Sequence, residues 1–246
     1  MTRPKASILI TRPQPGADRF AQELRDALPC AVLMHVSPVI RIKPVPESLA
    51  LDAVRGLIVT SEAAIPPLTQ LTTRRDLPVF CVGTRARDAA RAAGFEAETM
   101  GADADELVDA MLRFGPKSPL LHIRGEHARG NITGRLSTHG ILTRDIVLYE
   151  QVAQCLDTQA IGLLEGTGPV VVPLFSPRSA ALVAEQTSAS GPRYVVAMSW
   201  AVAAELPRGW AKTTVIASRP DSVAMTQAVT GLFDTYGFLE TGETRG

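Results

Sequence analysis

The stretch PVVVPLFSPRSAALVAEQ, residues 169–186, contains the pattern that decides the fold. It begins with an apolar run that has no polar alternation, as expected of a parallel strand covered on both faces. The run stops at Ser176-Pro177, and the Ala-rich segment 179–186 that follows is typical of a helix. A serine at this point can cap the new helix. Residues 169–186 therefore predict one strand–turn–helix unit.

The same unit recurs along the whole chain. Further apolar runs that stop at a small or hydroxyl residue are residues 6–11, 56–60, 78–82, 120–123, 194–198 and 213–217. Helical stretches such as residues 85–93 lie between them. Alternating strands and helices indicate an α/β protein with parallel sheets.

The strand ends also repeat at a nearly constant spacing. Four pairs of similar strand ends are separated by 112 to 118 residues: Arg12 and Arg124, Ser61 and Ser176, Gly83 and Ser199, and Gly101 and Arg219. We interpret the chain as two copies of a four-unit module, which gives two similar lobes, each a parallel sheet flanked by helices. The alternative is chance, because any α/β protein has similar strand ends.

Two extended segments interrupt the alternation of strands and helices. Residues 36–46 carry Pro38, Pro44 and Pro46, and proline disfavours a helix in the residue before it. Residues 145–152 read DIVLYEQV and have no helical pattern. Both segments lie near the predicted lobe boundaries, so we expect them to pair as a two-stranded connector.

The composition argues against several classes of protein. The 246 residues include 25 Lys+Arg and 25 Asp+Glu, and this balance argues against a general binder of nucleic acid or of acidic membranes. No apolar run reaches the ~18 residues of a membrane span, and residues 8–10 are too short for a signal peptide. Cys30, Cys81 and Cys155 have no paired spacing, which favours a reducing compartment. We therefore expect a cytoplasmic protein.

No motif for a nucleotide, a metal or an activated nucleophile is present, so we expect no cofactor and no metal. His122 and His127 are five residues apart, which does not fit a helical metal pair. The informative residues are instead the arginines of the strand-to-helix turns: Arg12, Arg124, Arg178 and Arg219. Ligands of parallel sheets bind beyond the carboxyl ends of the strands, where helix N-termini attract anions. The turns therefore predict a polyanionic ligand such as a polycarboxylate, unless the arginines are merely solvated.

Taken in order, the strand ends resemble uroporphyrinogen-III synthase. The resemblance covers nearly the whole chain and is carried by Thr11-Arg12-Pro13, Thr60-Ser61, Val82-Gly83, the Gly101…Leu107 segment, residues 147–152 and Phe175-Ser176-Pro177. It implies two α/β lobes joined by a two-stranded connector. Residues 1–35 and 153–246 would form the first lobe, residues 39–148 the second, inserted lobe, and residues 36–38 and 149–152 the connector.

The resemblance also implies the reaction, in which linear hydroxymethylbilane loses water, its terminal ring is inverted, and the macrocycle closes to uroporphyrinogen III. The many carboxylates of this substrate agree with the polyanion site. Tyr149 is the expected catalytic residue, because a phenol can donate a proton to the departing hydroxyl. The expected substrate-binding residues are Arg12, Thr60, Ser61, Gly83, Thr84, Gly101, Arg124, Ser176, Arg178, Ser199 and Arg219.

We expect a monomer that receives its substrate from hydroxymethylbilane synthase. The alternative is a non-enzymatic two-lobed module that binds a polycarboxylate, since fold alone does not decide function.

The chain departs from the family pattern in both turns that follow Gly83 and Ser199. The family often has a threonine three residues after the turn glycine, and Ala86 and Val202 stand at these places. Thr84 or Ser199 would have to supply the missing hydroxyl. We expect Trp200 and Trp210 to be packing residues.

Overall fold

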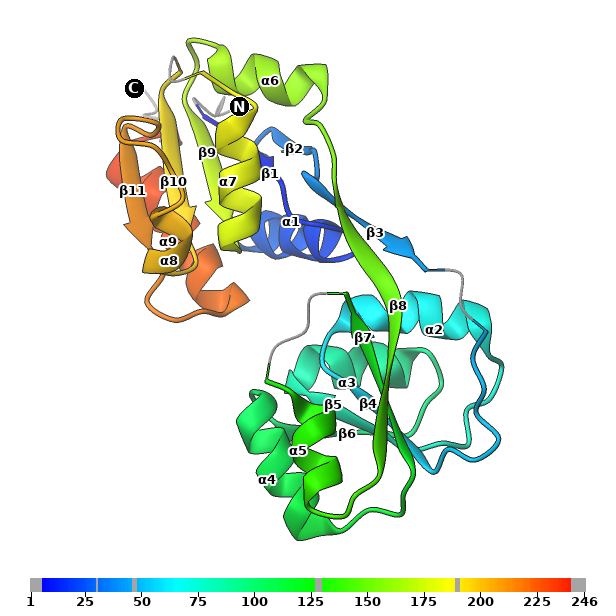
Figure 1. Cartoon of the computed structure of the whole chain (residues 1–246). Coiled ribbons are helices and arrows are strands. Elements are labelled where there is room, and N and C mark those ends of the chain that lie inside the picture. Colours follow the sequence, from blue (N-terminus) through cyan, green and yellow to red (C-terminus); the bar gives the residue numbers. More distant parts are fainter. Residues whose placement is uncertain (1–5, 30, 46–47, 127–129, 189–190, 240–246) are drawn as a thin grey trace. The chain divides into compact units, whose positions relative to one another are not determined.

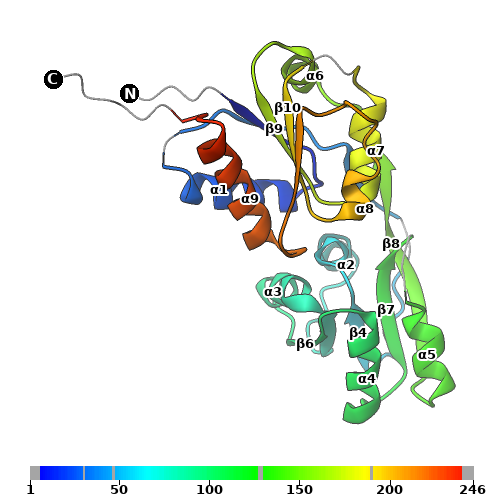
Figure 2. The ribbon, with the colours of Figure 1, turned by 90° about the vertical axis from the view of Figure 1, so that its left-hand side faces the viewer.

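The computed structural model describes residues 6–29, 31–45, 48–126, 130–188 and 191–239. The chain divides into two compact units, of which unit 1 comprises residues 1–41 and 152–246 and unit 2 comprises residues 42–151. Each unit contains one sheet with helices on both faces (Figures 1 and 2). Cys30, Pro46 and His127 lie outside the described residues.

Unit 1 is a five-stranded sheet in the order β11-β10-β9-β1-β2, with parallel neighbours throughout. Its strands are β1 (Ser7–Ile10), β2 (Met34–Val36), β9 (Val170–Leu174), β10 (Arg193–Ala197) and β11 (Thr213–Ile216). Helices α1 (Gly16–Ala27) and α9 (Ser222–Thr235) cover one face, and α6 (Thr158–Glu165), α7 (Pro177–Glu185) and α8 (Trp200–Ala203) cover the other. The strands are apolar on both faces because both faces are covered.

The two faces of this sheet explain the apolar spacing of the helices. Phe20 and Leu24 of α1 lie one turn apart and pack with Met225 of α9 and with Ile8 of β1. On the other face, Val183 of α7 is completely buried in a second cluster. Each helix has one apolar face that must pack against another element. The sheet offers two faces for this purpose, which explains the apolar pattern of the helices on both sides.

Unit 2 is a six-stranded sheet in the order β3-β8-β7-β4-β5-β6. Its strands are β3 (Ile40–Pro44), β4 (Gly56–Val59), β5 (Val79–Val82), β6 (Ala97–Gly101), β7 (Leu120–Gly125) and β8 (Thr143–Ala153). A short 3₁₀ helix (Glu62–Ala64), α2 (Ile65–Leu71) and α3 (Gly83–Ala92) cover one face, and α4 (Ala104–Phe114) and α5 (Ile132–Thr138) cover the other. Asp103 caps α4 by accepting hydrogen bonds from two backbone N–H groups of its first turn, and Gly115 ends it in the left-handed region.

Strands β3 and β8 form the two-stranded connector that the extended segments predict. Val45 N–H donates to Leu148 O, and Gln154 N–H donates to Val39 O. The residue number falls along one strand as it rises along the other, so the pair is antiparallel. Strand β8 is 11 residues long and includes residues 149–152, whereas β3 begins at Ile40 and so follows residues 36–38 of the expected connector.

Both units have the same strand order, although their strands come from different parts of the chain. In unit 1, β1 leads to β2 on one side, while β9, β10 and β11 follow on the other. In unit 2, β7 and β8 take the places of β1 and β2, and β4, β5 and β6 take the places of β9, β10 and β11. The paired strand ends of the sequence repeat therefore follow equivalent strands, which confirms the two-copy interpretation.

The topology also locates a switch point in each sheet, where the direction of strand addition reverses. It lies between β1 and β9 in unit 1 and between β7 and β4 in unit 2. Ligands of open parallel sheets bind outside the carboxyl ends of the strands at such a point.

The structure contains two strands that no apolar run marks in the sequence, although Gly101 at the end of β6 belongs to the repeat of strand ends. Strand β2 has three residues, and its Val36 belongs to the segment that the proline pattern predicts as an extended linker. Strand β6 is the edge of its sheet and reads AETMG, so it has no continuous apolar run. Within the described ranges, no helix has the length and apolar character that crossing a bilayer requires.

Candidate active site

The switch point of unit 1 holds Arg12 in a fixed position. The central guanidinium carbon of Arg12 lies 4.1 Å from the centroid of the Phe175 ring, in cation–π geometry. A Cβ at Gly16 would lie 2.8 Å from Arg12 Nε, so glycine leaves the room that the guanidinium occupies beside α1. Arg12 therefore lies at the carboxyl end of β1 beside Phe175, the residue that follows β9.

Ser176 stands at the other side of this switch point. Its side-chain oxygen accepts a hydrogen bond of 3.1 Å from the Ser179 N–H and thereby caps α7. Arg178 lies in the first turn of the same helix. The N-terminus of α7 carries the positive end of the helix dipole, so this turn favours anions.

The remaining turns of unit 1 follow β10 and β11. Ser199 precedes α8 but makes no side-chain capping hydrogen bond. Arg219 Nε lies 3.2 Å from Asp221 Oδ2, and its side chain remains 69% exposed. Trp200 is 79% exposed, so its assignment as a packing residue is wrong, whereas Trp210 is 2% exposed and packs as expected. The indole is exposed because Trp200 lies in the first turn of a four-residue helix, at the carboxyl ends of the strands.

The switch point of unit 2 surrounds Tyr149. The side chain is only 6% exposed, and its hydroxyl forms hydrogen bonds with the Ser61 side chain and with the Gly125 backbone. Burial raises the pKa of Tyr149 above its ordinary value, and the two hydrogen bonds oppose the rise only in part. Tyr149 is therefore a protonated, positioned phenol at neutral pH.

The direction of the Tyr149 side chain follows from an irregular register between β7 and β8. Arg124 pairs with Val147 and Gly125 pairs with Tyr149, so Leu148 is skipped. Leu148 and Tyr149 consequently pack in the same cluster, on the face covered by α2 and α3. Bulges of this kind re-aim side chains near functional sites.

Gly125 is the residue that permits this packing. A Cβ at Gly125 would lie 2.6 Å from both Cε2 and Cζ of Tyr149 and 3.0 Å from its hydroxyl. Real Cβ atoms essentially never approach another atom so closely. The glycine is therefore needed for side-chain space and not for an unusual backbone angle.

Arg124 makes several polar contacts within unit 2. Nη1 donates to Gly125 O at 3.0 Å and to Glu126 O at 3.1 Å, and Nε lies 3.4 Å from Asp145 Oδ2. These bonds fix the end of β7 next to Tyr149. Arg124 therefore organises this strand end and also lines the cavity of about 320 Å³ beside it.

A polar cluster around the buried His122, which sequence reasoning missed, lies beside α5. His122, 2% exposed, has Nδ1 3.1 Å from Asp145 Oδ1, and the Thr133 hydroxyl donates to the same carboxylate. Burial lowers the pKa of His122, and Asp145 opposes this only in part. For Asp145, burial favours a higher pKa, but Thr133, His122 and Arg124 together bring it below its ordinary value. The cluster lines a cavity of about 320 Å³.

The other expected residues of unit 2 lie at the same edge of the sheet. Thr60 follows β4 directly, and Gly83 and Thr84 begin α3. Gly83 has a φ of 72°, in the left-handed region that favours glycine. At the end of β6, a Cβ on Gly101 would lie 2.5 Å from Glu106 Cβ, so glycine lets this strand end approach α4.

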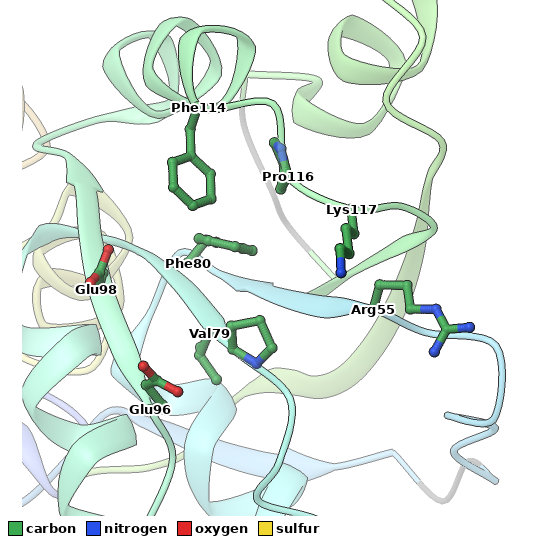
Figure 3. Close-up of a pocket in the computed structure, with 9 residues that line it drawn as sticks. Arg55, Val79, Phe80, Glu96, Glu98, Phe114, Pro116 and Lys117 are labelled. Atoms are coloured by element: carbon green, nitrogen blue, oxygen red, sulfur yellow. The ribbon is translucent and has the colours of Figure 1, made fainter.

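A larger cavity of about 410 Å³ lies at the opposite edge of unit 2 (Figure 3). Phe80 and Phe114 lie at its centre, Glu96 and Glu98 on one side, and Lys117 on the other. Because several of its residues precede the strands of the sheet, it opens at the amino ends and is separate from the switch point.

Comparison with known proteins agrees with this geometry. The family model described as uroporphyrinogen-III synthase HemD matches residues 31–227. No curated protein matches the chain by sequence. Uroporphyrinogen-III synthetase from Helicobacter pylori 26695 matches with a TM-score of 0.65 and 14% identity, over 92% of this chain and 99% of that one.

A mutant uroporphyrinogen III synthase from the extremely thermophilic bacterium Thermus thermophilus matches at 13% identity over 93% of this chain and 99% of that one, with a TM-score of 0.44. The Helicobacter pylori match supports the two-lobed α/β fold. The family model extends over most of the chain and includes Tyr149 and residues of both sheets. The chain therefore belongs to the uroporphyrinogen-III synthase family.

Proposed function

We propose that the carboxyl edges of the two sheets bind hydroxymethylbilane and that the Tyr149 phenol assists the loss of its hydroxyl group. As a member of its family, the chain is a cyclising lyase of tetrapyrrole biosynthesis that forms uroporphyrinogen III with inversion of the terminal ring. The observation that carries the assignment of Tyr149 is its buried, protonated phenol at the switch point of unit 2.

The substrate-binding residues follow from the chemistry of the substrate. A linear tetrapyrrole with many carboxylates needs several dispersed anion sites, and the strand-end turns offer arginines and helix N-termini. Arg12 is the best-supported contact, because its guanidinium packs on Phe175 and Gly16 leaves the room that it occupies. We extend the proposal to the remaining turn residues: Thr60, Ser61, Gly83, Thr84, Gly101, Arg124, Ser176, Arg178, Ser199 and Arg219.

The chemical step balances with Tyr149 as the proton donor. The bond between the hydroxymethyl carbon and its oxygen breaks, and the phenol proton moves to that oxygen, so that water leaves. The pyrrole nitrogen donates electron density to the carbon that loses the hydroxyl. The Ser61 and Gly125 hydrogen bonds stabilise the phenolate that remains, since both lower the pKa of Tyr149.

Proton donation alone does not select the product, because ring closure without inversion gives the other isomer. The protein must also hold the terminal ring in the orientation that leads to inversion. Positioning of this kind can supply a large part of a rate enhancement. A side chain that is already held by its neighbours, such as Arg12, suits this purpose better than a mobile one, because it loses less conformational entropy when the substrate binds.

We further propose that the chain acts as a cytoplasmic monomer and receives its substrate from hydroxymethylbilane synthase. Cys81, which is buried, and Cys155, which is exposed, are both free thiols, in agreement with a reducing compartment. Family membership favours the enzyme over a non-enzymatic polycarboxylate-binding module.

Replacement of Tyr149 tests the proposed role. Tyr149→Phe keeps the ring and removes the proton donor, so we expect isomer III formation to fall by up to about 10²-fold without being abolished, since general acid catalysis contributes at this scale. Tyr236→Phe is the matched control, because this tyrosine ends α9 and its hydroxyl contacts Thr213. A folded Tyr149→Phe variant with an unchanged rate would return Tyr149 to a packing role.

A further inference from the structure

Trp200 is a large apolar side chain that the fold leaves in solvent. It is 79% exposed, while Trp210 is buried, with the Arg193 guanidinium 4.3 Å from its ring centroid and its Nε1 donating to Thr187 at 3.3 Å. Trp210 thus has a structural explanation, and Trp200 has none within unit 1. An aromatic side chain of this size normally buries most of its surface on folding or on binding.

Trp200 lies close to the proposed substrate-binding residues of unit 1. It lies three residues after the end of β10, and β10 lies between β9 and β11 in the sheet. The strand ends on either side carry Ser176 and Arg219, both proposed substrate contacts. Trp200 therefore stands at the carboxyl edge of the sheet, among the residues expected to bind the tetrapyrrole.

We propose that the Trp200 indole stacks on a pyrrole ring of the bound tetrapyrrole and helps to select this class of substrate. The inference rests on the proposed substrate-binding edge. An indole offers a flat aromatic face, and aromatic rings pair in offset or edge-to-face arrangements. Each pyrrole of the substrate is flanked by carboxylates, and the exposed Arg219 at the neighbouring strand end supplies the positive charge that they need.

Stacking on a ring that does not react predicts a particular kinetic signature. The contact exists in the bound substrate and in the transition state alike, so its loss changes KM and not kcat. For Trp200→Ala we expect KM to rise about three- to tenfold, with a smaller rise for Trp200→Phe, which keeps an aromatic face. The unfolding free energy should change little, because an exposed side chain contributes little to folding.

Leu33→Ala is the matched control for these kinetics. Leu33 is 53% exposed and precedes β2, so it lies at the amino edge of the same sheet. We expect its KM to equal that of the wild type. An equal rise in KM for Leu33→Ala and Trp200→Ala would overturn the proposal, as would a wild-type KM in Trp200→Ala.

Fluorescence gives an independent readout, because the chain has only two tryptophans. Iodide should quench the exposed Trp200 and spare Trp210, and added uroporphyrinogen III should protect the quenched fraction. Trp200→Phe should lose that fraction. If equilibrium dialysis shows that uroporphyrinogen III binds the wild type without protecting Trp200, the stacking proposal is wrong.

These outcomes are distinguishable from a failure of the proposed function. A wild-type protein that yields only isomer I contradicts the enzymatic assignment itself. A wild-type protein that yields isomer III, together with an unchanged Trp200→Ala, contradicts the role of Trp200 alone.

Discussion

Gly125→Ala is the substitution whose effect the structure predicts most sharply. The added Cβ would lie 2.6 Å from two carbons of the Tyr149 ring, and ordinary contacts begin at 3.4 Å. The ring must therefore retreat by about 0.8 Å or more, given these two distances. That displacement moves the phenol away from its hydrogen-bond partners, Ser61 and the Gly125 backbone.

Two magnitudes follow from this displacement. Overpacking of a well-packed site costs about 1–3 kcal/mol of unfolding free energy. A misplacement of a catalytic group by about 1 Å can lower a rate by about 10²-fold. The two effects are similar in size, since a 10²-fold rate loss corresponds to about 2.7 kcal/mol. Both arise from the contact with Tyr149, because Gly125 has no left-handed φ that an alanine would strain.

The assay measures isomer III formation by Gly125→Ala together with its urea unfolding curve. The same substitution is then made in the Tyr149→Phe background, where the phenolic proton is already absent. If Gly125 acts through Tyr149, the rate effects of the two changes do not add. A stable Gly125→Ala variant with the wild-type rate, or a full additive loss in the double variant, would refute this reasoning.

Two further outcomes follow from the charged groups of the two units. Arg12→Ala should raise KM by about tenfold or more, because hydrogen bonds to charged groups contribute about 1.5–3 kcal/mol, while its urea midpoint changes little; unchanged kinetics would remove Arg12 from the site. The lowered folded pKa of His122 means that the unfolded chain binds more protons below pH 6.5, so stability falls there as the pH decreases, by at most about 1.4 kcal/mol per pH unit. Urea unfolding between pH 5 and 8 should show this dependence of stability on pH in the wild type and a smaller one in His122→Asn. Equal slopes in the two proteins would show that His122 is not its cause.

The architecture could be predicted because most of the buried parallel strands consist of uninterrupted apolar residues. Residues 169–175 read PVVVPLF and contain β9, and the equivalent residues 56–60 contain β4. Strands β2 and β6 contain no such run. Strand β6, AETMG, was therefore indicated only by its end at Gly101, and the three-residue β2 was missed.

The site was predictable at the level of strand ends and less so at the level of side chains. Arg12 and Arg124 look alike in the sequence, yet one lies on Phe175 and the other bonds to Asp145 and to the end of its own strand. That difference depends on which side chains lie on the neighbouring strands. The role of Gly125 is also invisible in the sequence, because it arises from the skipped register that turns Tyr149 toward it.

Trp200 shows a third limit of sequence reasoning. An isolated tryptophan near the end of an apolar run is usually a packing residue, and Trp210 is one. The sequence placed Trp200 next to the Ser199 strand end, but only the structure shows that the helix there has four residues and leaves the indole exposed.

The central claim is that this chain directs the cyclisation of hydroxymethylbilane. The most direct measurement supplies hydroxymethylbilane in situ from its synthase, adds the purified protein, oxidises the products and separates the uroporphyrin isomers. The account predicts a large excess of isomer III over the isomer I that forms spontaneously, with the excess lowered in Tyr149→Phe. Isomer I alone, at every concentration of folded protein, would contradict it.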